Sequence, residues 1–142
     1  MKSLLSIVTA LFISPLIALA HGEDKPGPNG GFIRMPGAFH TEVIPLAANS
    51  LKILLLDIAW KNPSVKGASV KAVYQSVANQ KSDAVCKAEA NFFVCKFSGN
   101  IDISKSGKLE IQAEREGIKG ILVSYPLPLK LEVINDGHGA HH

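Results

Sequence analysis

The sequence has few of the residues from which most active sites are built. It contains two cysteines, one tryptophan and two tyrosines among 142 residues, and no histidine lies between His40 and His138. A central scaffold without histidine leaves few groups for acid–base catalysis. The sequence also has no Ser/His/Asp set, no phosphate-binding glycine loop and no paired acidic motif. We therefore expect that the protein is not an enzyme.

Concentrated charge is lacking as well. Lysine and arginine total 15 against 12 aspartates and glutamates, and the basic residues are scattered among the acidic ones. Nucleic-acid-binding domains gather lysine and arginine on one face or along one helix. The charge pattern therefore predicts no nucleic-acid partner.

Long apolar runs are confined to the first twenty residues. Lys2 is followed by LLSIVTALFISPLIALA, which ends in a small-x-small triplet. This pattern is typical of a cleavable secretory signal peptide over residues 1–20, and the run is short for a membrane-spanning helix. Cleavage after Ala20 leaves a periplasmic chain of 122 residues that begins at His21 and has no stable membrane insertion. An uncleaved anchor is the alternative.

Strand signals recur along the rest of the chain, and helix signals are nearly absent. Eight short segments rich in β-branched and aromatic residues are separated by Gly, Asn, Ser or Pro. In KLEIQAE (108–114), apolar residues alternate with polar ones, as in a strand with one wet face. We expect an all-β fold, an immunoglobulin-like β-sandwich of about seven to eight strands, with a small barrel as the alternative. The predicted core residues are Ile53, Leu55, Ile58, Trp60, Val70, Val73, Leu109, Ile111, Ile121 and Val123.

The two cysteines are spaced for one hairpin. If Ala90 and Asn91 form a two-residue turn in DAVCKAEANFFVCKF (83–97), Cys86 lies directly opposite Cys95. In an exported protein such a pair predicts a disulfide. A copper or zinc dithiolate is the alternative, although the spacing is not the CxxC of metal knuckles.

The histidines divide the chain into four parts. We expect a signal peptide (1–20), an N-terminal metal-binding arm (21–30), a β-sandwich domain (31–133) and a flexible His-rich tail (134–142). A histidine at the start of a chain chelates Cu(II) through its free amine and ring, so His21 is a candidate ligand or only the residue left by trimming. The tail ligands His138, His141 and His142 are a loose capture arm or a solvated terminus.

Three further candidate ligands lie in or beside the segment AFHTEV (38–43). Alternation places His40 and Glu42 on one face, which we expect to be the more open one, while Phe39, Thr41 and Val43 face inward. His40 is predicted to complete the copper site, with Glu42 as an auxiliary ligand. If MPG turns the preceding strand back, Met35 joins the same face and offers a soft sulfur. The alternatives are an unpartnered surface histidine and a packing methionine.

The segment GPNGGFIRMPGAFHTEV (27–43) resembles exported heavy-metal resistance proteins. These are small periplasmic metal-binding proteins and the N-terminal regions of periplasmic adaptor subunits of metal-efflux pumps, whose pattern runs GPHGG, a strand, a turn and HxE. This chain departs from the pattern at Asn29, where the family has histidine. In segment 27–43 the positions that match the pattern are Gly27, Pro28, Gly30, Gly31, His40 and Glu42. A second segment, NPSVKGASV (62–70), resembles a turn of bacterial immunoglobulin-like modules.

The resemblance implies a periplasmic protein that binds a transition metal, copper first and zinc second. Its expected role is chaperone, buffer or accessory to an efflux system, and its expected partners are the metal ion and an efflux-pump subunit. A metal-free interaction module of the cell envelope is the alternative. A copper monooxygenase also begins with histidine, but the few aromatic residues do not provide a substrate platform.

Overall fold

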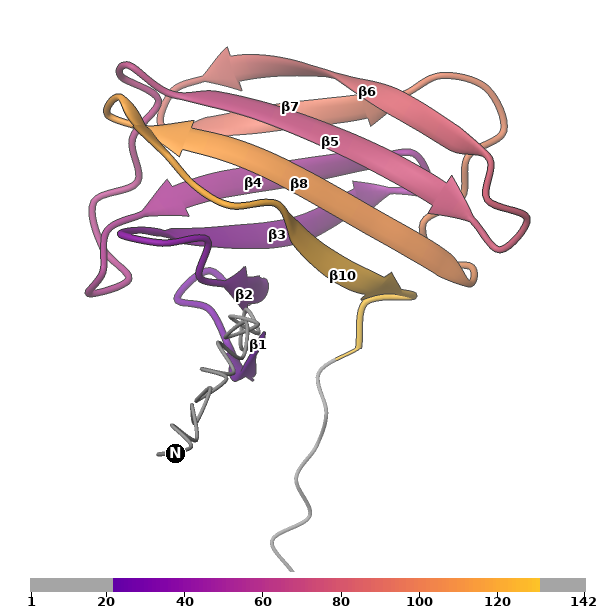
Figure 1. Ribbon diagram of the computed structural model, residues 1–142, viewed down its shortest axis with the longest axis horizontal. Helices are drawn as coiled ribbons and strands as arrows, with labels where there is room; N and C mark the ends of the chain where they lie inside the picture. The colour runs from indigo at the N-terminus through magenta and orange to yellow at the C-terminus, as the bar shows by residue number, and fades with distance from the viewer. Residues whose placement is uncertain (1–21, 131–142) are drawn as a thin grey trace, which may run out of the picture.

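The computed structural model describes residues 22–130, which contain ten strands and no helix (Figure 1). The expected all-β class is confirmed. Within these residues no helix has the length and apolarity needed to cross a membrane. The strands are β1 (Gly22–Pro26), β2 (Phe32–Arg34), β3 (His40–Ala47), β4 (Ser50–Leu56), β5 (Ser69–Ser76), β6 (Lys81–Glu89), β7 (Phe92–Phe97), β8 (Gly107–Arg115), β9 (Ile118–Lys119) and β10 (Val123–Leu127).

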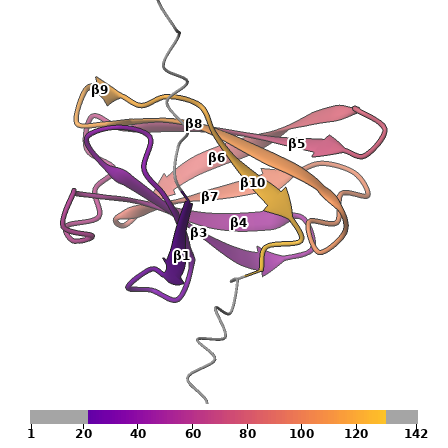
Figure 2. The same cartoon turned by 60° about the horizontal axis from the view of Figure 1, so that its bottom comes forward.

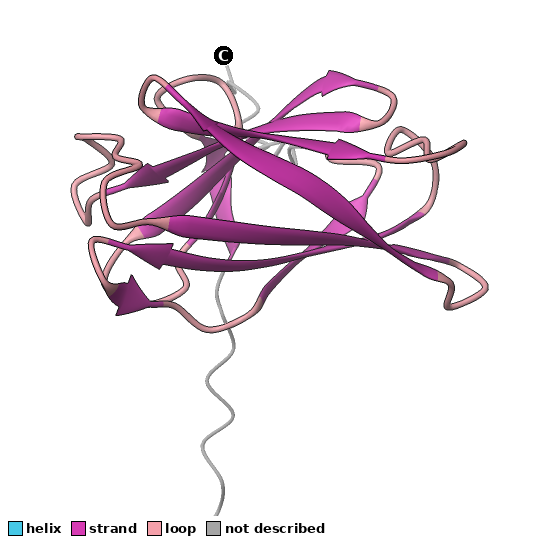
Figure 3. Cartoon of the chain, turned by 90° about the horizontal axis from the view of Figure 1, so that it is seen from above, coloured by secondary structure: helices cyan, strands magenta, loops and turns pink. Residues whose placement is uncertain are grey.

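The strands form one nearly closed antiparallel sheet. Nine of them follow the order β1-β2-β3-β4-β7-β6-β5-β8-β10, and β9 pairs with β8. β6 joins the two halves, because its residues 81–83 pair with β5 whereas residues 84–89 pair with β7. β5 and β8 thereby lie across the core from β3 and β4 (Figures 1 and 3). β10 runs beside β8 (Figure 2).

Alternating side chains build the core between the two halves. In β8 Leu109, Ile111 and Ala113 are buried, as their spacing predicts, while the residues between them are only partly covered. The buried cluster also draws on β3, β4, β5, β7 and β10. Its largest members include Phe39, Phe97, Leu51, Ile53, Leu55 and Tyr125.

The β6–β7 hairpin is the one that the cysteine spacing predicts. Glu89 pairs with Phe92 across a turn at Ala90 and Asn91, and Cys86 pairs with Cys95. The two cysteines form a disulfide with a Cα–Cα distance of 4.0 Å. Cys95 is fully buried in the core, so the bridge ties the hairpin to the interior.

Four of the ten predicted core residues lie outside the central cluster. Ile58 is 57% exposed and Ile121 is 52% exposed, because both lie in loops that continue beyond a strand end. Trp60 is half-buried against a second, smaller cluster on the outside of the sheet. In β5 the inward residue is Ala72, whereas Val73 is half-buried on the outer face.

β1 was not expected, since its sequence GEDKP has none of the residues enriched in strands.

The sheet closes between β10 and the β2–β3 side through individual contacts. The Ile121 amide donates to the Pro36 carbonyl at 2.9 Å, just before β10 begins. The Arg34 side chain donates through Nε to the Ser124 carbonyl at 3.2 Å. A further contact joins side chains of β3 and β10, because the Thr41 hydroxyl lies 2.7 Å from the Tyr125 hydroxyl.

Candidate functional site

The loop between β1 and β2 folds over the carboxylate of Glu42. The Gly27 amide donates to the Gly31 carbonyl at 2.8 Å, which closes the loop. Glu42 Oε1 accepts the backbone amides of Asn29 and Gly31, each at 2.9 Å. Its Oε2 accepts the Asn29 side-chain amide at 2.9 Å. Glu42 is fully buried, and these three donors replace the water that its charge loses.

Two glycines of this loop are required by its closeness to β3. A Cβ on Gly27 would lie 2.4 Å from the Glu42 carboxyl carbon, and one on Gly31 would lie 2.7 Å from the Val43 carbonyl oxygen. Real Cβ atoms do not come so close to other heavy atoms. The glycine-rich segment therefore forms a close-fitting cover over Glu42, held by Asn29 at the position where the chain departs from the metal-resistance pattern.

His40 is buried at the start of β3, with both ring nitrogens in hydrogen bonds. Its exposed fraction is 3%. Trp60 donates from Nε1 to His40 Nε2 at 3.2 Å, and His40 Nδ1 lies 3.2 Å from the Asp57 carbonyl oxygen. Because an indole N–H only donates, Nε2 must be the acceptor, which assigns the hydrogen to Nδ1. His40 is accordingly a neutral imidazole that bridges Trp60 and the loop after β4.

Asp57 organises the loop that places Trp60 over His40. Its Oδ1 accepts the amides of Ala59 and Lys61 at 2.9 Å, and its Oδ2 accepts the Asn62 side-chain amide at 2.7 Å. The Lys61 bond is the main cause that lowers the pKa of Asp57, and the Asn62 and Ala59 bonds lower it further. The turn carries Trp60 at a φ of 62°, with its ring edge-on to the imidazole at a centroid distance of 5.7 Å.

The predicted alternation of β3 is confirmed, but the expected openness of one face is wrong. His40 and Glu42 do share the face opposite Thr41 and Val43. That face is closed, however, because Trp60 covers His40 and the glycine loop covers Glu42. Both covering groups come from other parts of the chain, which the alternation of one strand does not report.

Met35 lies immediately after β2 and is 39% exposed. In the sheet Gly22 pairs with Arg34, and Arg34 pairs with Thr41, so these residues form one row across β1, β2 and β3. Met35 follows Arg34 in the chain, and His40 precedes Thr41. Because neighbouring strands are antiparallel, both lie on the same side of that row.

The remaining predicted ligands lie outside the described residues. They are His21, His138, His141 and His142. Within the described part of the chain, no group of three or more His, Cys, Asp or Glu residues is arranged to hold a metal ion. The donors fit a metal only in part, since His40 and Glu42 are already hydrogen-bonded and Met35 is a single soft ligand.

Two residues of this region were not predicted to take part in it. Trp60 was predicted to join the central core, yet its indole holds His40 instead. Asn29 was noted only as a departure from a pattern, yet it supplies two of the three bonds to Glu42. An aspartate that begins a short turn, as Asp57 does, is the local signal for the Trp60 loop.

Comparison with protein-family models, with curated protein sequences and with solved structures finds no match to this chain.

Proposed function

We propose that this chain is an exported transition-metal-binding protein, for copper first and zinc second. It acts in the periplasm as a chaperone, a buffer or an accessory to heavy-metal efflux. The observation that carries the proposal is the strand register at the start of the described chain. On one side of the row of Gly22, Arg34 and Thr41, Met35 follows Arg34 and His40 precedes Thr41, and in the sequence His21 comes directly before Gly22.

The chemistry of this donor set suits copper. The amine and ring of an N-terminal His21 give a chelate for Cu(II), and an α-amine with a pKa of about 7.7 to 8.0 loses its proton to a metal near neutral pH. The accessible Met35 thioether supplies a soft ligand for Cu(I). The tail histidines serve as a loose capture arm.

His40 joins the metal only when Trp60 releases it. The lone pair of Nε2 receives the indole N–H, so a metal and Trp60 compete for the same atom. Glu42 stays under its glycine cover and positions β3 beside the site. Metal binding through His40 is thus coupled to movement of the Trp60 side chain.

The test is a Cu(II) titration of protein processed to begin at His21, followed by calorimetry, visible absorption and fluorescence. Trp60 is the single tryptophan of the chain and contacts His40, so the tryptophan emission reports directly on the surroundings of His40. We expect one equivalent of copper to give a visible d–d band, raise the melting temperature and quench Trp60. The matched control has one residue added before His21, which blocks the amine and must weaken binding. Equal affinity of the extended and native forms would contradict the proposed site.

A second candidate is a metal-free interaction module of the cell envelope. It is favoured by the closed hydrogen-bond networks around His40 and Glu42, which are complete without a metal. The same titration separates the two candidates. The module predicts no visible band and no copper-dependent change in melting temperature.

A further inference from the structure

Three lysines on the outer face of β4, β6 and β7 have no acidic partner within the part of the chain that the structure describes. They are Lys52, Lys87 and Lys96, named here the lysine triad. Lys52 and Lys87 both pair with Val94, from opposite sides of β7, and Lys96 lies two residues further along that strand. Among the described residues, no salt bridge includes any of the three.

The outer face of β5, β8 and the start of β6 is built differently, although it also carries three lysines. Lys71 lies 4.0 Å from Asp83, and Lys108 lies 2.6 Å from Glu110. Lys81 lies 3.4 Å from the other oxygen of Glu110. Adjacent like charges on a sheet face repel one another, and here acidic neighbours offset that cost. The lysine triad keeps the repulsion, which an anionic partner would relieve.

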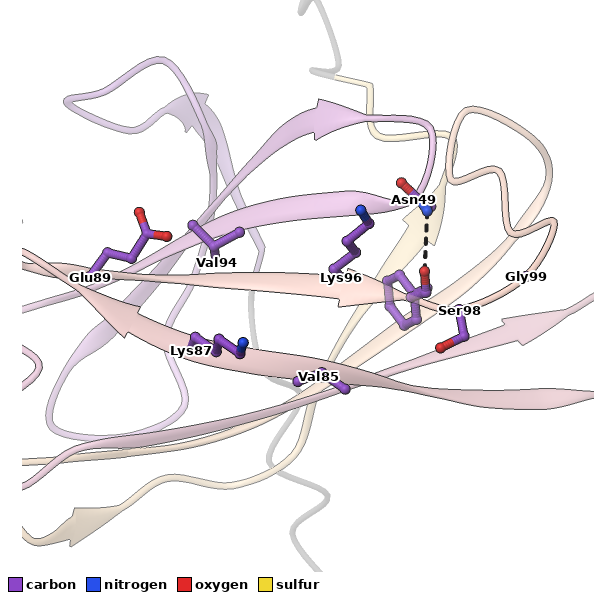
Figure 4. Close-up of a pocket in the computed structure, with 9 residues that line it drawn as sticks. Asn49, Val85, Lys87, Glu89, Val94, Lys96, Ser98 and Gly99 are labelled. Atoms are coloured by element: carbon purple, nitrogen blue, oxygen red, sulfur yellow. Dashed lines mark hydrogen bonds between the residues drawn. The ribbon is translucent and has the colours of Figure 1, made fainter.

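The triad borders a hollow with an apolar floor. The hollow has a volume of about 450 Å³ and is lined by Val85, Val94, Lys87 and Lys96, among others. Figure 4 shows Glu89 at one end of it and Ser98 at the other. Val85 is 60% exposed. Beside the hollow, the Lys52 ammonium sits 4.2 Å above the centre of the Phe92 ring, which holds that charge in place.

One edge of the hollow is an unpaired stretch of strand. Residues 84–89 of β6 pair with β7 on one side, and no described strand pairs with them on the other. Ala88 lies on the same face of β6 as the core-facing residues Ala84 and Cys86. It is nevertheless exposed, because β5 no longer runs beside β6 at that point. An open edge of this kind offers backbone N–H and C=O groups to another strand.

We propose that this face binds an extended acidic segment of a partner protein, which adds as a strand to residues 84–89 of β6. In an added strand every second side chain shares the outer face, so an acidic residue lies opposite Lys87 and an apolar one opposite Val85. Lys96 and Lys52 lie two and three strand spacings from the added strand, about 10 and 14 Å, so they attract its acidic side chains at long range rather than by contact. The site is separate from Met35 and His40, the described residues among the proposed metal ligands, which lie just after β2 and at the start of β3.

A peptide partner fits this face better than a small anion or a lipid headgroup. An isolated anion would satisfy the ammonium groups but would leave the β6 edge and the exposed Val85 unused. An extended peptide uses all three features together, because ladder hydrogen bonds supply affinity while alternate side chains supply specificity.

The test uses fluorescence anisotropy with a labelled peptide of Glu-Thr-Val-Thr repeats, called here the alternating peptide, whose glutamate and valine side chains share one face of an added strand. The comparison peptide has the same length and charge but carries proline in place of threonine, so it lacks every second backbone amide and cannot form a continuous ladder. A triad variant with Lys→Gln at all three positions is compared with a control variant of equal net charge, and both are checked by melting temperature. The control replaces three other exposed lysines, Lys66, Lys105 and Lys119.

We expect the alternating peptide to bind and the triad variant to weaken it by about tenfold at low salt, since exposed ion pairs each contribute modestly. The control variant should change the affinity less than about twofold by the same reasoning. The proposal is overturned if the alternating peptide does not bind, if both variants weaken it equally, or if the proline peptide binds as well. It is also overturned if vesicles of phosphatidylglycerol and phosphatidylcholine bind through the triad while the peptide does not.

Discussion

At the scale of single residues, the start of β3 is unusual because three polar side chains in succession are buried. His40 is 3% exposed, and Thr41 and Glu42 are not exposed at all. Each has its partners: Trp60 for His40, the Tyr125 hydroxyl for Thr41, and the glycine loop for Glu42. A buried polar group without a partner costs about 1 to 3 kcal/mol, so these contacts fix which segments cover β3.

Glu42→Gln tests whether the carboxylate holds the glycine loop. A glutamine has one acceptor oxygen where the carboxylate has two, so its amide hydrogens would face a donor from Asn29 or Gly31. We expect a loss of about 1 to 3 kcal/mol in the free energy of unfolding, measured by urea denaturation.

The control for this substitution is Glu89→Gln, which removes the same charge from an exposed position at the end of β6. That substitution should change the free energy of unfolding by less than about 0.5 kcal/mol. Equal effects of the two substitutions would mean that the net charge, rather than the loop contact, determines the stability.

At the scale of elements, periodicity and spacing were enough where the structure is local. The β6–β7 hairpin with its disulfide and the alternation of β8 follow from residues within one or two strands. Each of the eight expected segments overlaps a strand of the structure. β1 escaped prediction because it is a polar edge strand whose pairing depends on backbone bonds with β2.

The candidate site was predictable only in part, because its surroundings come from distant segments. Alternation correctly placed His40 and Glu42 on one face of β3. It gave no sign that Trp60, twenty residues further on, would occupy the imidazole of His40. Ile58 failed as a core residue for the same reason, since the Asp57 turn directs that loop outward while Trp60 turns back onto the sheet.

The contact between β3 and β10 predicts a dependence of stability on alkaline pH. Tyr125 is buried, and its hydroxyl lies 2.7 Å from that of Thr41. Burial raises the pKa of the Tyr125 phenol above its ordinary value of about 10. Above that pH the unfolded chain loses the phenol proton while the folded chain keeps it. The contribution of this group to the free energy of unfolding is therefore at its maximum below about pH 10. Above that pH it falls by about 1.4 kcal/mol per pH unit.

Tyr125→Phe should remove this slope, at a cost of about 1 kcal/mol near neutral pH for the lost hydrogen bond. The measurement is urea unfolding at a series of pH values on both sides of about pH 10. Thr41→Val is the control, because it removes the hydroxyl partner but keeps the buried phenol and hence the slope. If wild type and Tyr125→Phe lose stability in parallel as the pH rises, another group titrates.

At the scale of the whole molecule, the sheet is nearly closed, and β10 meets β2 and β3 through a seam. The seam runs from Pro36 and Arg34 on one side to Ile121, Ser124 and Tyr125 on the other. In a continuous ladder many hydrogen bonds resist a local distortion together. Closure of a seam made of separate contacts instead requires that each pair of groups stays close. The proposed metal ligand Met35 lies between Arg34 and Pro36, so the geometry of that site is tied to closure of the sheet.

Gly120→Ala tests that closure. Gly120 is buried at the seam, and an added Cβ would lie 2.6 Å from Pro36 Cβ and 3.0 Å from Phe39 Cζ. Pro36 is fixed by the bond from Ile121, so the two segments must separate to admit the methyl group. Overpacking of this kind costs about 1 to 3 kcal/mol, which urea denaturation measures.

The matched control is Ile121→Ala at the next residue, whose side chain is 52% exposed and whose backbone bond to Pro36 is kept. It should change the stability by less than about 0.5 kcal/mol. Hydrogen exchange of the Ile121 amide then locates the effect: opening of the seam predicts faster exchange in Gly120→Ala than in Ile121→Ala. If Gly120→Ala is destabilised while that amide exchanges as slowly as in the control, the methyl group is accommodated on the Phe39 side of the core and the seam stays closed.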